Sequence, residues 1–99
     1  MVTLASAAFA DERSVYEKIR DSWNPLASDQ VEIVQAGLKK TIQKCNRVLT
    51  ELSVNIYALE EAEKPYYASV NRAQFFETQR KCSKKIAVYK KRIQYLQGH

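Results

Sequence analysis

The feature that most constrains the fold is a pair of apolar stripes whose members recur at alternating steps of four and three residues. The first stripe consists of Val31, Gln35, Leu38, Ile42, Cys45, Leu49, Leu52, Ile56 and Leu59. The second consists of Phe75, Gln79, Cys82, Ile86, Tyr89, Ile93 and Leu96. Because this spacing places side chains on one face of an α-helix, each stripe predicts a long amphipathic helix, with one glutamine of each, Gln35 and Gln79, on the interior seam.

A break lies between the two stripes, in the segment "EEAEKPYYAS", which contains Pro65. Proline cannot continue a helix but suits the first turn of a new one. If the chain folds back here, the numbers of facing residues must have a constant sum, and they add to 127 or 128, as for Cys45 with Cys82 and Leu49 with Gln79. The midpoint of that sum falls at the break, so the two helices are predicted to form an antiparallel hairpin.

Such a hairpin leaves apolar residues beside the seam uncovered, Val34 and Val48 among them, so a third helix is needed. The N-terminal part of the chain offers helical spacing in Tyr16, Ile19, Trp23 and Leu26. Pro25 ends this helix, and Ser28 or Asp29 is the expected N-cap of the next. The sequence therefore predicts a single all-α domain over residues 1–99. Its expected architecture is an antiparallel up-down-up three-helix bundle with two long C-terminal helices, at about 3–23, 29–62 and 66–97.

Cys45 and Cys82 occupy one layer of the predicted hairpin and are expected to touch. Two buried thiols acting as small apolar side chains are the ordinary interpretation, since two cysteines are too few for a secreted disulfide framework. A disulfide across the hairpin is the second alternative. Zinc is the third alternative, although the sequence has no other cysteine and its only histidine is His99, at the C-terminus. The pair is thus a candidate thiol pair or disulfide, and no metal site is predicted.

No pattern typical of catalysis is found in the sequence. The two glycines, Gly37 and Gly98, cannot make a phosphate-binding loop. A serine nucleophile would lack a base, because His99 is the last residue. The carboxylates of "EEAE" are typical of a solvated helix end. We therefore predict that the chain is not an enzyme and takes no cofactor.

Basic residues gather in the segment "RKCSKKIAVYKKR", and the net charge of +5 favours acidic partners. A solvated helix face is the ordinary interpretation of such a run. An acidic protein surface or an anionic membrane would also be attracted to it. Nucleic acid is not favoured, because exposed aromatic residues are not interleaved with the basic ones. The predicted partner-binding residues are Tyr57, Arg80, Lys84, Lys91 and Tyr95.

The opening segment "MVTLASAAFADE" ends like a small-residue cleavage site, but it has no basic region before its apolar part. A leftover targeting segment is therefore one interpretation of it. No run approaches the roughly 18 apolar residues that a membrane-spanning helix needs.

Two segments carry a resemblance to a known family. "LKKTIQKCNRVLTELSVNIYALE" (38–60) and "RAQFFETQRKCSKKI" (72–86) resemble the second and third helices of the N-terminal regulatory domain in the syntaxin 6 subfamily of SNARE proteins. Trp23 stands where the family's first helix ends in an Arg-Trp pair, although Ser22 precedes it here. The turn is also shorter than the family's and lacks its Asn-Pro.

The resemblance implies a three-helix regulatory bundle that acts as a non-catalytic protein-interaction module in vesicle transport. Its partners would be tethering or SNARE-assembly factors on the cytoplasmic face of trans-Golgi or endosomal membranes.

A different class of function also fits the residues: a small helical structural subunit of an organellar membrane protein complex, mitochondrial or thylakoid. This alternative accounts for the leader-like start and for a basic helix next to anionic lipid. It places the chain in an intermembrane space or lumen, where the two cysteines would be oxidised.

Overall fold

The computed structural model describes residues 12–98, and every regular element within them is helical. Helix α2 spans Val15–Trp23, the short 3-10 helix η1 spans Pro25–Ala27, α3 spans Val31–Glu61 and α4 spans Pro65–Gln97. The all-α prediction is therefore confirmed. The part of the first predicted helix that falls on residues 3–11 lies outside the described residues.

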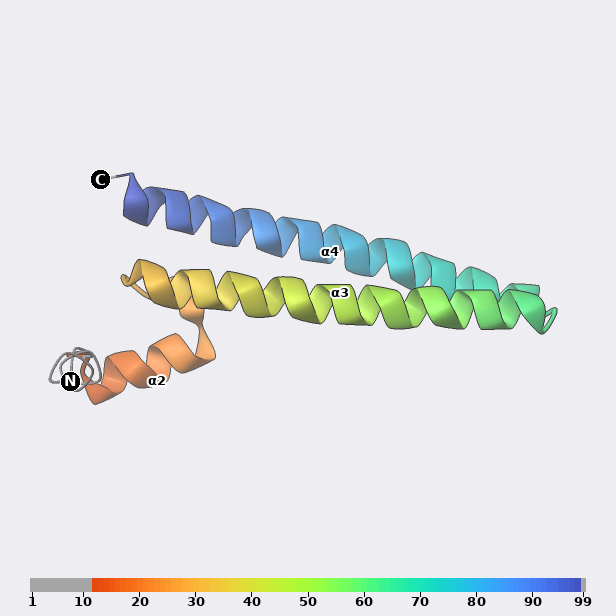
Figure 1. Ribbon diagram of the computed structural model, residues 1–99, viewed down its shortest axis with the longest axis horizontal. Helices are drawn as coiled ribbons and strands as arrows, with labels where there is room; N and C mark the ends of the chain where they lie inside the picture. The colour runs from red at the N-terminus through yellow and green to blue at the C-terminus, as the bar shows by residue number, and fades with distance from the viewer. Residues whose placement is uncertain (1–11, 99) are drawn as a thin grey trace, which may run out of the picture.

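Helices α3 and α4 have 31 and 33 residues and lie side by side in opposite directions (Figure 1). The turn that joins them is a Schellman motif: the amide of Lys64 donates to the carbonyl of Leu59 at 2.9 Å, and the amide of Glu63 donates to that of Glu60 at 3.1 Å. Glu63 takes the left-handed position of this motif with φ of 56°. Pro65 is the first residue of α4, as its missing amide hydrogen allows.

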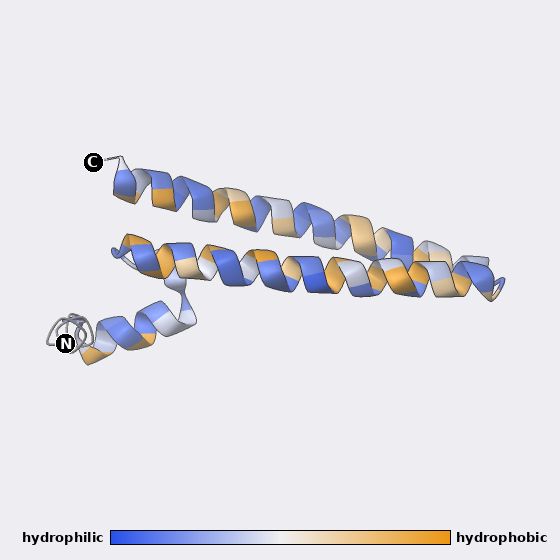
Figure 2. Cartoon of the chain, viewed as in Figure 1, coloured by the Kyte–Doolittle hydropathy of each residue, from blue (hydrophilic) through white to orange (hydrophobic). Residues whose placement is uncertain are grey.

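Few side chains are fully buried, because each helix of a lone hairpin can cover only one stripe of the other. The fully buried apolar side chains among residues 12–98 are Val34, Ala68 and Tyr89, and most of the remaining stripe residues are half-buried. Gln35 and Gln79 were expected on the interior seam but are exposed, since the edges of a two-helix seam stay open to solvent. Apolar and polar residues alternate along both long helices (Figure 2), and several large apolar side chains, such as Val54 and Phe76, are exposed.

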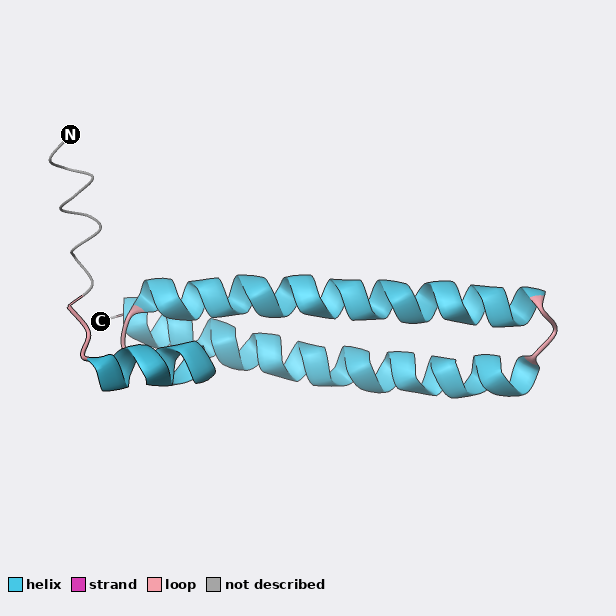
Figure 3. Cartoon of the chain, turned by 90° about the horizontal axis from the view of Figure 1, so that it is seen from below, coloured by secondary structure: helices cyan, strands magenta, loops and turns pink. Residues whose placement is uncertain are grey.

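The prediction that α2 covers the hairpin is wrong for the described residues. This helix has nine residues and packs against η1, which in turn packs against α3. Both lie beside the N-terminal end of α3 (Figures 1 and 3). Three side chains that were expected to cover the hairpin, Tyr16, Ile19 and Trp23, are 74%, 56% and 86% exposed. The described helix is short because it begins at Val15, after the Ser14 N-cap, and its apolar side chains are exposed. Among the described residues, α2 and η1 lie only at one end of the hairpin, and most of its length is left uncovered.

Local hydrogen bonds define where α2 begins. Ser14 and Glu17 form a capping box, in which the Ser14 hydroxyl accepts from the Glu17 amide and the Glu17 carboxylate accepts from the Ser14 amide, both at 3.1 Å. These bonds from Ser14 lower the pKa of the Glu17 carboxyl. Helix α3 starts differently: Gln30 is its N-cap, and the predicted Ser28 instead accepts a bond from the Gln30 amide.

A buried carboxylate holds α2 to η1. Asp21 is 3% exposed and accepts hydrogen bonds from Arg13 at 2.8 Å, from Arg20 at 3.1 Å and from the Ser28 hydroxyl at 3.1 Å. Burial alone would raise the pKa of Asp21, but these donors outweigh it and hold the pKa below its ordinary value. Arg92 of α4 donates to the Ser28 carbonyl at 2.8 Å, so the same segment is also tied to the end of the hairpin.

Candidate functional site

The sulfur atoms of Cys45 and Cys82 are joined in a disulfide, with the two Cα atoms 6.1 Å apart. The bond therefore joins two residues that the predicted register places opposite each other, and of the three states left open by the sequence the structure has the disulfide. Residues 12–98 contain no group of three or more side chains that could hold a metal ion. The bond fixes the register of α3 against α4 about halfway along the hairpin.

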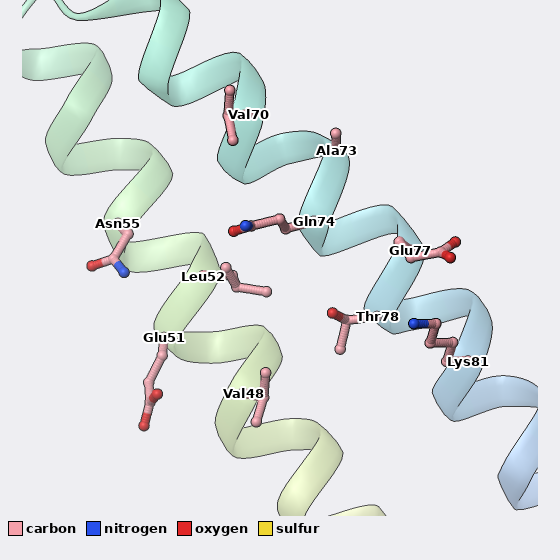
Figure 4. Close-up of a pocket in the computed structure, with 10 residues that line it drawn as sticks. All are labelled: Val48, Glu51, Leu52, Asn55, Val70, Ala73, Gln74, Glu77, Thr78 and Lys81. Carbon is pink, nitrogen blue, oxygen red and sulfur yellow. The ribbon is translucent and has the colours of Figure 1, made fainter.

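A groove runs between α3 and α4 from the disulfide towards the turn. Its larger part has a volume of about 750 Å³; α3 contributes Val48, Glu51, Leu52 and Asn55, and α4 contributes Val70, Ala73, Gln74, Glu77, Thr78 and Lys81. Figure 4 shows Leu52, Gln74 and Thr78 between the two helices, with Glu51 and Glu77 on the outer edges. The floor is thus largely uncharged, and the carboxylates lie on its rims.

Lysines surround the other part of the groove, next to the disulfide. This hollow of about 320 Å³ is lined by Thr41, Lys44, Cys45, Lys81, Cys82 and Lys85. Lys81 lines both hollows, so the two lie next to each other, and together they are called the α3–α4 groove below.

The charge around the disulfide end of the groove is basic. Residues 37–50 and 79–95 contain no aspartate or glutamate. They carry eleven basic residues, Lys39, Lys40, Lys44, Arg47, Arg80, Lys81, Lys84, Lys85, Lys90, Lys91 and Arg92. Towards the turn the groove carries Glu51 and Glu77, and a hydrogen bond from Arg80 lowers the pKa of Glu77. An uncharged floor with basic side chains at one end is an arrangement suited to binding an acidic partner.

The predicted partner-binding residues are all exposed. Arg80, Lys84, Lys91 and Tyr95 lie on one face of α4, at steps of four, seven and four residues, whereas Tyr57 is on α3. Tyr57 lies near the turn and Tyr95 near the opposite end, about 25 residues apart along the hairpin, or roughly 37 Å at 1.5 Å per residue. Arg80 pairs with Glu77 at 2.8 Å, and neither it nor Lys84 nor Lys91 lines the α3–α4 groove.

The groove was not predicted from the sequence, although a signal for it is present. Thr41, Val48 and Asn55 recur every seven residues beside the first stripe, and Asn71, Thr78 and Lys85 do the same beside the second. The two sets face each other in an antiparallel hairpin, because the numbers of facing members again have a constant sum. They mark the side on which the groove lies.

Comparisons of the chain with family models, with curated proteins and with solved structures found no match in any of the three. The resemblance to the syntaxin 6 subfamily therefore stays a prediction from the residues quoted for it. Within the described part of the chain, none of the helices combines the length and apolar character needed to cross a bilayer.

Proposed function

We propose that this chain is a non-catalytic protein-interaction module, a disulfide-linked helical hairpin that packs into a larger protein assembly through the uncovered side of α3 and α4. The observation that supports this is the number of large apolar side chains that are exposed to solvent in a hairpin with few buried residues. Large apolar side chains exposed on α3 and α4 are Val54, Tyr57, Tyr66, Tyr67, Val70, Phe76, Val88 and Tyr95. Where such side chains form a contiguous patch, the patch is typical of an interaction site.

In this proposal the third layer of the helical bundle comes from a partner. Two packed helices leave half-buried stripes, and a third helix laid against both would complete the kind of antiparallel bundle that the sequence predicts. The alternating up-down-up arrangement then belongs to the complex. Helix α2 contributes little to this third layer, because α2 and η1 lie only beside the start of α3.

The disulfide favours one class of assembly over the other. Disulfides persist in oxidising compartments and are rare in the cytosol. The Cys45–Cys82 bond therefore supports a structural subunit of an organellar membrane complex, facing an intermembrane space or lumen. A SNARE-type regulatory module on the cytoplasmic face of Golgi or endosomal membranes would carry the same two residues as thiols.

The proposal is tested by separating a native extract by size, with the chain tagged at its own locus. We expect the chain to migrate far above its own mass of 11.4 kDa. Migration as a free monomer would contradict the proposal.

Alkylation of the denatured, non-reduced protein then decides between the two classes. For the organellar subunit we expect neither cysteine to be alkylated, because both sulfur atoms are held in the disulfide. Two titratable thiols would favour the SNARE-type module instead.

A further inference from the structure

On the side of the hairpin that carries the α3–α4 groove, the short helix η1 packs against one end of α3. Val34, which is fully buried, lies seven residues before Thr41 and fourteen before Val48, so all three are on the same side of α3. At its neighbour Gly37, an added Cβ atom would lie 2.8 Å from Pro25 of η1. Among residues 12–98, η1 thus covers this side at the open end of the hairpin, and no described element covers it from the disulfide to the turn.

The shape of the groove suits a helix. It lies between two antiparallel helices over residues 41–55 of α3, which corresponds to roughly 21 Å of rod at 1.5 Å per residue. An apolar helical stripe is the usual occupant of such a groove, whereas a bilayer surface cannot enter it. Val48 and Leu52 supply apolar contact on α3, and Val70 and Ala73 supply it on the α4 side.

The charges of the groove define the occupant further. Lys44, Lys81 and Lys85 line its disulfide end, and in the part of the chain that the structure describes none of the three forms a direct ion pair, although Lys81 is near enough to Glu77 to help lower the pKa of that carboxyl. A second copy of the chain laid parallel along this side would bring its own basic segments, 37–50 and 79–95, against these lysines, and one laid antiparallel would bring Glu51 and Glu77 together with the same excess of basic residues. Opposed like charges disfavour such a pairing. Carboxylates on the occupant would be attracted to the same site.

We infer that the α3–α4 groove binds an amphipathic helix of a partner protein, with its apolar stripe on the floor of the groove and its carboxylates against Lys44, Lys81 and Lys85. The inference rests on the proposed function and names the chemistry of the partner. The bound helix would cover the disulfide and complete the third layer over the length of α3 that η1 leaves open.

The test uses the full, oxidised chain and two fluorescent peptides of about 21 residues, each with leucine at the a and d positions of its heptads. One peptide carries glutamate at the e and g positions and the other carries lysine there. Fluorescence anisotropy is expected to show binding of the glutamate peptide that weakens with salt, and binding of the lysine peptide that is at least about tenfold weaker.

Two triple variants locate the binding site. Lys44→Glu, Lys81→Glu and Lys85→Glu together should weaken binding of the glutamate peptide by at least about tenfold. The matched control reverses Lys39, Lys64 and Lys90, which are exposed, lie outside the groove and are not among the predicted partner-binding residues. It makes the same change of net charge and should retain most of the affinity. Circular dichroism checks that both variants keep their helices.

Several results would overturn the inference. These are equal binding of the two peptides, an equal loss in both triple variants, or a concentration-dependent dimer of the chain with no peptide bound. Binding of anionic vesicles that does not depend on the three groove lysines, with no peptide binding, would also overturn it. If the glutamate peptide fails to bind while the chain still migrates in a large native assembly, this inference fails and the proposed function stands.

Discussion

Removing the Cys45–Cys82 disulfide should cost more stability than any other single change in the hairpin. The bond joins residues 37 apart in sequence, and its position across α3 and α4 closes the turn and both inner helix halves into one loop. The loop-entropy relation for a loop of this length gives about 4 kcal/mol at 25 °C. Because so few side chains are fully buried, little else in the structure offsets that loss.

Thermal unfolding followed by far-ultraviolet circular dichroism measures the effect. The double variant Cys45→Ala with Cys82→Ala is compared with the oxidised chain and with the same chain in a phosphine reductant. We expect the double variant and the reduced chain to unfold at similar temperatures, both lower than the oxidised chain by roughly 15–30 °C. Agreement between the two assigns the loss to the cross-link and not to the alanine side chains.

Equal unfolding temperatures for the oxidised and reduced chains would refute this reasoning. That result would mean that side-chain packing holds the two helices together, and that the disulfide adds no measurable stability.

Three further substitutions test local features of the fold. Asp21→Asn should destabilise the chain by about 1–3 kcal/mol, because the two arginines and the serine that donate to this side chain lose a negatively charged acceptor. Amide exchange across residues 15–28 should become faster. Since the pKa of Asp21 is lowered in the folded state, its stabilising contribution is complete above the ordinary value near 4 and is lost as the pH falls through the lower folded value. An acid titration of the variant that matches the parent chain would contradict this. Gly37→Ala should destabilise by roughly 1–2 kcal/mol despite the higher helix propensity of alanine, since the added Cβ atom would lie 2.8 Å from both Pro25 and the Tyr89 ring; a higher unfolding temperature would show that the contact relaxes. Glu63→Gly should stabilise by about 0.5–1 kcal/mol, because glycine adopts the left-handed position of the turn without strain, whereas Glu61→Gly, within α3, should destabilise by a similar amount.

The sequence could predict the hairpin because its signals are local and repeated. Stripes with a period of four and three predict helices wherever they occur, and a constant sum of facing residues needs only the position of the turn. The placement of Cys45 opposite Cys82 follows from that register alone. The bonding state of the two sulfurs did not follow, since it depends on the redox environment as well as on distance.

The arrangement of α2 could not be predicted in the same way. Tyr16, Ile19 and Trp23 have helical spacing, which indicates a helix but does not say where its apolar side will pack. The position of α2 depends on Asp21, which is buried against Arg13 and Ser28. A lone aspartate in a polar stretch gives no sign of such burial.

The groove was missed for a related reason. Its lysines have the spacing of a solvated helix face, and only the packed hairpin brings Lys44 of α3 next to Lys81 and Lys85 of α4. Val48 was recognised as apolar and uncovered, but its basic surroundings become visible only in three dimensions.

Small-angle X-ray scattering of the free, oxidised chain tests most directly the central claim that the hairpin is a rod with one long side open. The structure measures 62 × 31 × 23 Å and has a radius of gyration of 19.2 Å. A compact domain of the same length would have a radius of gyration of about 13 Å. We predict a measured value near the former, from a monomer with an elongated distance distribution. A value near the latter would contradict the account, because it would mean that the chain covers its own hairpin and leaves no open side for a partner.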